Sequence, residues 1–149
     1  MDDLSWRRHA NPWSVWTRFA AIPVGVVAGC SRVWIGWWFL IPLGLVVAWL
    51  FVNTRVFPAV SDDGWAARGI YGERLWLEHS AAMPVTHRGV LRALMAVGLL
   101  GGTVMIYGVV ALSVWPAVAG ATILIMGQIW RIDRMGLLYG EVRDRGATT

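Results

Sequence analysis

The chain has 149 residues, of which 57% are hydrophobic, and it carries a formal net charge of +4. This length suits one domain and leaves no room for a soluble catalytic domain of ordinary size beside a membrane domain. The single cysteine, Cys30, excludes an intrachain disulfide and a cysteine-based zinc site. All 13 basic residues are arginines scattered among apolar stretches, so we interpret the charge as a signal for membrane topology and anionic lipid, not for nucleic acid.

Long apolar stretches predict membrane-spanning helices. Residues 19–52 contain a single charge, Arg32, and residues 93–115 and 117–130 contain none. A bilayer core of roughly 30 Å needs about 20 apolar residues per helix, so the first stretch is too long for one span. The small and polar residues from Gly29 to Arg32 predict a turn, and Pro116 suits the first turn of a helix. We therefore expect spans at about 13–29, 33–52, 89–112 and 116–139, in a single transmembrane domain covering residues 1–149.

The predicted fold class is all-α: an integral membrane four-helix bundle of two helical hairpins, with an amphipathic interfacial helix between the second and third spans. The interfacial segment covers residues 61–79, and Ser61 with its two following aspartates is expected to cap the start of the helix. Small residues spaced four apart, such as Gly98 and Gly102, predict close helix packing. We expect residues 143–149 to form a short frayed tail.

The distribution of arginines predicts the orientation. With an even number of spans, the two termini and the central segment share one side, which then carries 12 of the 13 arginines and leaves only Arg32 opposite. The positive-inside rule therefore predicts a multi-pass protein of the inner (plasma) membrane with both termini in the cytoplasm. We expect no cleaved signal peptide, although residues 27–30 are similar to a lipoprotein cleavage site.

The polar residues expected on the cytoplasmic side support a structural interpretation. Charges near the membrane must be paired, so these residues predict a network of ion pairs between the helices. Its expected members are Arg18, Glu73, Arg74, Asp133 and Arg134. Within this network we predict that Asp133 pairs with an arginine of another segment, Arg18 or Arg74 first.

The same region leaves a second interpretation open, a transition-metal or haem site. Its candidate ligands are His9, Glu73, His79, His87 and Asp133. The histidines are separated by 70 and 8 residues, and no short metal-binding or catalytic motif occurs. We therefore assign no catalytic residue from the sequence and expect no cofactor, with a metal or haem as the alternative.

Three segments carry a resemblance to a known family. Residues 9–18 (HANPWSVWTR), the pair 65–69 (WAARG) and 72–74 (GER), and residues 130–135 (WRIDRM) resemble a family of small prokaryotic membrane proteins catalogued as a domain of unknown function. The resemblance spans nearly the whole chain. It implies a polytopic membrane protein, but it implies no activity, cofactor or substrate.

For function, the sequence favours a small non-enzymatic membrane protein that binds lipid or a partner through its Arg- and Trp-rich cytoplasmic face. The residues expected to make these contacts are Trp13, Arg18, Arg68, Arg74, Arg88 and Arg134. Guanidinium groups beside tryptophans suit anionic headgroups, and a membrane-protein partner or a homo-oligomer remains open. The alternative is a membrane-embedded enzyme with a histidine and carboxylate site at the cytoplasmic boundary.

Overall fold

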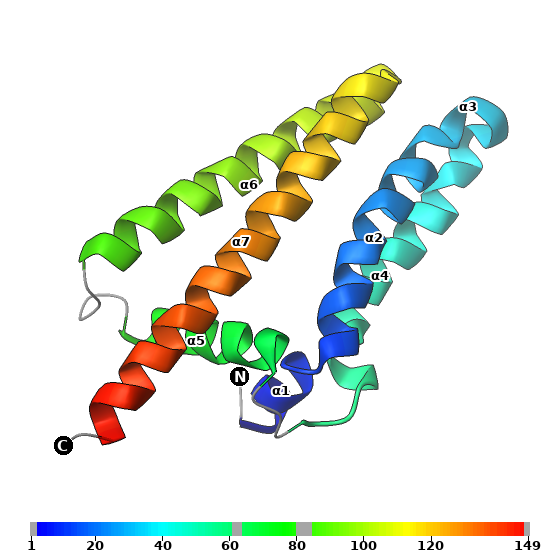
Figure 1. Ribbon diagram of the computed structural model, residues 1–149. Coiled ribbons are helices and arrows are strands. Elements are labelled where there is room, and N and C mark those ends of the chain that lie inside the picture. Colours follow the sequence, from blue (N-terminus) through cyan, green and yellow to red (C-terminus); the bar gives the residue numbers. More distant parts are fainter. Residues whose placement is uncertain (1–2, 61–63, 80–84, 148–149) are drawn as a thin grey trace.

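The computed structural model describes residues 3–60, 64–79 and 85–147, and these residues form helices without strands. Helices α2 and α4 form one hairpin and α6 and α7 form a second, while α1, α5 and the C-terminal part of α7 lie at one end of the molecule (Figure 1). We call this end the α5 end and the opposite one the turn end. The elements in chain order are α1 (Asp3–His9), α2 (Pro12–Cys30), α3 (Arg32–Ile35), the 3-10 helix η1 (Gly36–Phe39), α4 (Leu40–Val56), α5 (Trp65–His79), α6 (Val85–Ala111) and α7 (Val114–Ala147).

The first hairpin begins as its sequence predicts but turns later than expected. Asn11 caps α2, its side chain accepting a hydrogen bond from the Trp13 amide at 3.0 Å, and proline occupies the first helical position. The chain then makes one helical turn, α3, and the 3-10 helix η1 before α4 begins at Leu40. Gly36 joins these two short helices with a φ of 54°, a conformation that glycine adopts without strain. The predicted second span, 33–52, is thus corrected to a helix that starts seven residues later.

The second hairpin is held by close backbone contact between α6 and α7. A Cβ atom added to Gly101 would lie 2.6 Å from the Leu124 nitrogen, so only glycine permits this approach. Gly98 also faces α7, whereas Gly102 has nothing within 4 Å. The glycines of α6 that contact α7 are therefore Gly98 and Gly101, and not the predicted pair of Gly98 and Gly102, because α6 turns the face with residues 98 and 101 towards α7.

Helix α7 is longer than the predicted span of 116–139, and it continues through most of the expected frayed tail to Ala147. Its last part extends beyond the apolar hairpin, and its middle part packs against α5. Gly69 and Gly72 of α5 face Ile132 and Met135 of α7 so closely that added Cβ atoms would clash with both residues. The glycines that weaken α5 as an isolated helix thus provide its main contact surface.

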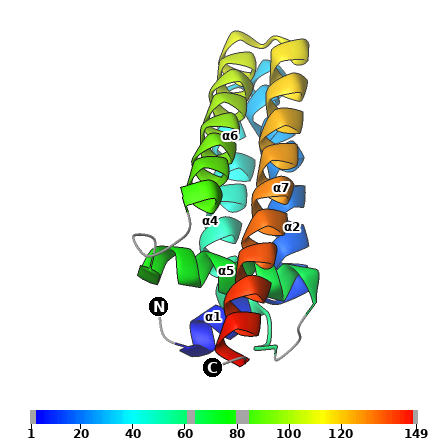
Figure 2. The ribbon, with the colours of Figure 1, turned by 60° about the vertical axis from the view of Figure 1, so that its left-hand side comes forward.

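Helix α5 lies across the ends of the longer helices, as Figures 1 and 2 both show. Its buried face joins residues of α1, α2 and α7 in one apolar cluster: Trp6, Ala10, Val15, Ala66, Ala67, Ile70 and Ile132. The predicted interfacial segment of 61–79 is thus described from residue 64, with α5 covering Trp65–His79. The predicted cap at residues 61–63 lies outside the described residues.

Two helical stretches of the described chain are long and apolar enough to cross a membrane by length and composition. They are Pro12–Val56, which contains the first hairpin, and His87–Ala111 within α6. The all-helical prediction is confirmed.

The two neighbouring glycines of α6 provide a test of the hairpin packing. We expect Gly101→Ala to lower the free energy of unfolding by about 1–3 kcal/mol, because the new methyl group meets backbone of α7 that cannot rotate away. Gly102→Ala is the matched control, and its higher helix propensity is expected to raise stability by up to about 1 kcal/mol. Thermal unfolding in detergent measures both, and equal effects would contradict this packing.

Candidate functional site

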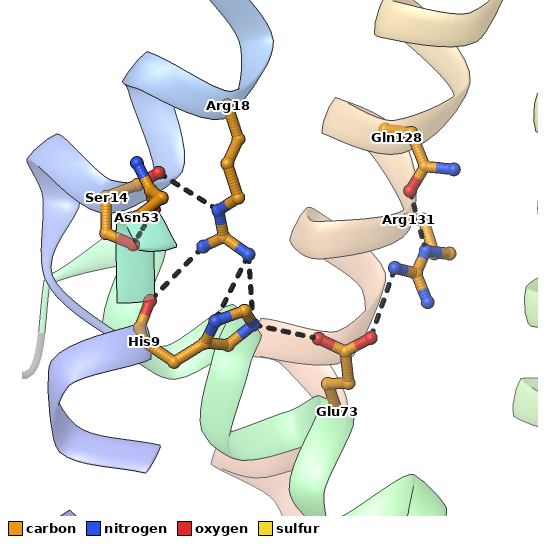
Figure 3. Close-up of polar contacts among 7 residues, drawn as sticks. All are labelled: His9, Ser14, Arg18, Asn53, Glu73, Gln128 and Arg131. Atoms are coloured by element: carbon orange, nitrogen blue, oxygen red, sulfur yellow. Dashed lines mark hydrogen bonds and ion pairs between the residues drawn. The ribbon is translucent and has the colours of Figure 1, made fainter. Parts of the chain in front are cut away.

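The carboxylate of Glu73 lies at the centre of a polar cluster at the α5 end. Its Oε1 accepts a hydrogen bond from Nη2 of Arg131 at 3.2 Å, and its Oε2 faces Nε2 of His9 at 3.8 Å (Figure 3). The side chains of Glu73 and His9 are 24% and 16% exposed. Burial alone would raise the pKa of Glu73, but the hydrogen bond from His9 and the charge of Arg131 together lower it below its ordinary value. Glu73 is therefore a paired carboxylate, held ionised by its neighbours.

Arg18 extends the cluster from α5 into the first hairpin. Its Nη1 lies 3.2 Å from Nδ1 and 3.0 Å from Nε2 of His9. Its Nη2 donates to the His9 carbonyl at 3.3 Å, and its Nε donates to the Ser14 carbonyl at 3.0 Å. A guanidinium only donates hydrogen bonds, so the His9 nitrogen that faces it must accept. Nε2 of His9 faces both the Arg18 guanidinium and the Glu73 carboxylate, so the ring links these two charged groups.

A buried set of neutral polar groups lies beside Arg18. Ser14 and Asn53 are both fully buried, and the Ser14 hydroxyl donates to Oδ1 of Asn53 at 2.5 Å. The Asn53 amide donates in turn to the Thr17 hydroxyl at 2.7 Å. Asn53 is the buried residue of α4, so these bonds fix the register of α2 against α4. On α7, Gln128 accepts from Nε of Arg131 at 3.0 Å and orients that guanidinium towards Glu73 (Figure 3).

The other carboxylates of the described chain are engaged at separate places. Arg74 contacts Asp3 at 2.6 Å and Glu78 at 3.0 Å, and these carboxylates raise the pKa of Arg74. Glu141 contacts His87 at 3.2 Å and Arg145 at 3.7 Å.

The predicted pair between Asp133 and Arg18 or Arg74 is wrong. Asp133 is exposed and instead accepts a hydrogen bond from Nε1 of Trp65 at 3.2 Å. Arg18 binds His9, and Arg74 binds the carboxylates of α1 and α5. The physical reason is position around α7: Arg131 and Asp133 are two residues apart and point in nearly opposite directions, so α7 presents Arg131, not Asp133, to the neighbouring helices. The carboxylate of the pair comes from Glu73 of α5.

Among the other residues predicted to form ion pairs, Glu73 and Arg74 do so, as described above, and Arg134 does not within the described chain. The buried Nε of Arg134 has no hydrogen-bond partner there.

The residues proposed as alternative metal ligands do not converge. No group of three or more histidine, cysteine, aspartate or glutamate side chains that could hold a metal occurs among the described residues. His9 and Glu73 are neighbours, but His87 binds Glu141 and Asp133 binds Trp65. The side chain of His79 lies outside the described part of the chain.

The residues predicted to contact lipid or a partner differ in their surroundings. Arg18 and Arg74 are engaged with protein groups. Trp13 and Arg68 are exposed, and Arg88 and Arg134 are half-buried.

The sequence analysis missed several members of the polar cluster. Arg131, Gln128, Ser14 and Asn53 each carry part of it. A sequence signal existed for Asn53, since an asparagine at the end of an apolar span needs a partner. For Arg131 the signal was weaker, because Asp133 and Arg134 compete with it on the same turn.

The fold and the site together define an all-helical protein of two apolar hairpins, linked at one end by a buried, ion-paired cluster. The chain belongs to the family of unknown function DUF6653, whose sequence pattern matches residues 1–149. No curated protein and no solved structure matches the chain.

The pairing of Glu73 predicts a pH-dependent stability. Because the pKa of Glu73 is lower in the folded protein, its contribution is complete above the ordinary carboxyl pKa of about 4.3 and is lost as the pH falls through the folded value. We expect Glu73→Gln to lower the free energy of unfolding near neutral pH by about 1–3 kcal/mol and to flatten the acid limb of the stability profile. Thermal unfolding in detergent as a function of pH measures both effects.

The control for this experiment is Asp133→Asn, which changes an exposed carboxylate at the same end of the molecule. Its expected effect is within about 0.5 kcal/mol at neutral pH. If Glu73→Gln follows the wild-type acid limb, or if Asp133→Asn is the more damaging change, Glu73 does not hold the cluster together.

Proposed function

We propose that this protein is a non-enzymatic, four-span integral membrane protein that binds anionic phospholipid headgroups at its cytoplasmic α5 end. Both hairpins cross the bilayer in this proposal, α5 lies in the interface, and the termini are cytoplasmic. The observation that carries it is an excess of arginines without carboxylate partners at the α5 end.

The exposed apolar surface supports the membrane placement. Side chains that would be costly to expose to water cover both hairpins, including Leu45 at 67%, Phe51 at 77% and Leu99 at 75% exposure. Tryptophans at the turn end are more exposed still, with Trp37 at 83% and Trp115 at 82%. Aromatic residues of this kind are enriched where helices leave the hydrocarbon and enter the headgroup region.

The arrangement of charge supports the orientation and the ligand. Twelve of the 13 arginines lie in α1, in α5 or in the parts of the long helices on the side of the α5 end, which the positive-inside rule assigns to the cytoplasm. The carboxylates of the described chain are already engaged there. Within the described chain, six arginines at this end have neither an ion pair nor a side-chain hydrogen bond: Arg8, Arg55, Arg68, Arg88, Arg92 and Arg134.

The surplus of arginines without ion pairs fits the binding of anionic headgroups better than it fits catalysis. Glu73, which has the most perturbed carboxyl environment of the site, is bound on both sides and has no free proton-accepting oxygen aimed at a cavity. The unpaired guanidinium groups retain donors that match phosphate geometry. A partner protein or a second copy remains an outcome of the tests below.

The topology is tested by reporter fusions that are active only outside the cytoplasm. We expect no activity from a fusion at Thr149 and full activity from one inserted after Trp37, because the proposal places these positions on opposite sides of the membrane. Activity at Thr149 would contradict an even number of spans with cytoplasmic termini.

Headgroup binding is tested by the triple variant Arg68→Gln, Arg88→Gln and Arg92→Gln. Each basic residue near an anionic surface contributes about 1 kcal/mol, so we expect roughly a hundredfold weaker binding of phosphatidylglycerol micelles to the detergent-purified protein at low salt. The triple Lys variant keeps the charge and is expected to lose little. If both variants bind as the wild type does, or if binding is insensitive to salt, the arginines do not serve this role.

A further inference from the structure

Outside the polar cluster, an apolar cleft lies between the two hairpins. Its volume is about 500 Å³, and residues of α2, α4 and α6 form most of its wall. The wall is aliphatic or aromatic apart from glycines and one charged residue, Arg32, at the turn end. Typical members of the wall are Ile22, Val26, Leu43, Val46 and Ile106.

The length of the cleft matches one leaflet of a bilayer. Phe39 at its turn end and Leu50 at its inner end both line it. They are eleven residues apart, which corresponds to about 16 Å along a helix. This is close to half of the roughly 30 Å hydrocarbon thickness. The cleft therefore has the length of one acyl chain of the leaflet at the turn end.

The turn end of the cleft is closed by contacts between the hairpins. A Cβ atom on Gly29 would lie 2.5 Å from Cγ1 of Val109, so the helices are in close contact there. Nη2 of Arg32 donates a hydrogen bond to the carbonyl of Val110. Within the described chain, the Arg32 side chain makes this one hydrogen bond. Because a guanidinium has five N–H donors, further donors of Arg32 remain available to a ligand.

Arg32 also lacks any nearby acidic residue in the sequence. No aspartate or glutamate occurs in residues 4–61 or 79–132, which include both hairpins except the inner half of α7. Arg32 forms no ion pair within the described chain, so an external anion can supply the counter-charge. An anion at the membrane surface is the natural counter-charge for a cation at the end of a hydrophobic span.

We propose that this cleft binds one acyl chain of an anionic phospholipid of the outer leaflet, whose phosphate pairs with Arg32. The site rests on the proposed membrane placement, but not on the headgroup binding proposed for the α5 end. Its two ligand-binding features are chemically distinct, an apolar wall of one-leaflet length and a single cation at the wall's outer end.

The acyl-chain part is tested with phosphatidylglycerol that carries a photoreactive group on its acyl chain, in vesicles of phosphatidylcholine and phosphatidylglycerol. We expect labelling of the wild-type protein to concentrate on peptides that contain Val46 and Ile106. Gly25→Leu extends a side chain from the cleft wall and is expected to abolish this labelling. Gly44→Leu adds the same side chain where nothing lies within 4 Å, and is expected to leave the labelling unchanged.

The headgroup part is tested by comparing Arg32→Gln with Arg32→Lys. Loss of a charge-assisted contact is expected to reduce phosphatidylglycerol labelling of the cleft by about tenfold in Arg32→Gln, with most of it retained in Arg32→Lys. A photoreactive phosphatidylcholine with the same chains should label the wild type as weakly as phosphatidylglycerol labels Arg32→Gln.

These outcomes are separable from those for the α5 end. The triple arginine variant is expected to keep its cleft labelling even where its salt-sensitive micelle binding is lost. The cleft proposal is overturned if the wild type is labelled evenly over exposed residues such as Phe51 and Leu99. It is also overturned if Gly25→Leu and Gly44→Leu, both shown to be folded by thermal unfolding, label alike.

Discussion

The fold depends on how one carboxylate near an apolar environment is neutralised. Glu73 belongs to α5, and its oxygens face Arg131 of α7 and His9 of α1. A carboxylate with 24% exposure is costly to leave unpaired, because removing one partner of a desolvated pair strands the other charge. The helices α1, α5 and α7, which are distant in sequence, therefore meet around the Glu73 side chain.

The contacts around Glu73 determine how the hairpins are joined. Arg18 connects His9 to α2, and the ring of Trp16 stacks on that of Trp65 with centroids 6.0 Å apart. The first hairpin is thus anchored to α5 by polar and aromatic contacts, whereas the second is anchored by glycine packing at Gly69 and Gly72. The cleft lies between hairpins that are tied in this way at the α5 end and touch again at Gly29 and Val109.

Hydropathy and punctuation in the sequence predict the helices well, because apolar runs, a capping Asn11 and turn residues are local signals. Local signals do not predict which helix face is used. Gly101 rather than Gly102 contacts α7, and Arg131 rather than Asp133 contacts Glu73, which are errors of about 100° and 200° around the helix. A rotation of this size changes no helix boundary, but it changes the partner of every polar side chain. Pairing between helices and the short elements α1, α3 and η1 therefore required the structure, whereas the approximate positions of the long helices did not.

The separation of acidic residues from the hairpins has a further physical consequence. All nine acidic residues lie outside residues 4–61 and 79–132, so an arginine within these ranges either reaches a carboxylate of another segment, as Arg131 reaches Glu73, or bonds to carbonyls, a histidine or an external anion. Arg18 bonds to His9 and the Ser14 carbonyl, and Arg32 bonds to the Val110 carbonyl. Carbonyl dipoles satisfy donors without cancelling charge, so these contacts leave each arginine with a full positive charge. Arg18 is then balanced through His9 and Glu73 within the protein, but Arg32 has no such relay. This difference explains why Arg18 stabilises the fold, whereas Arg32 is available to bind a ligand.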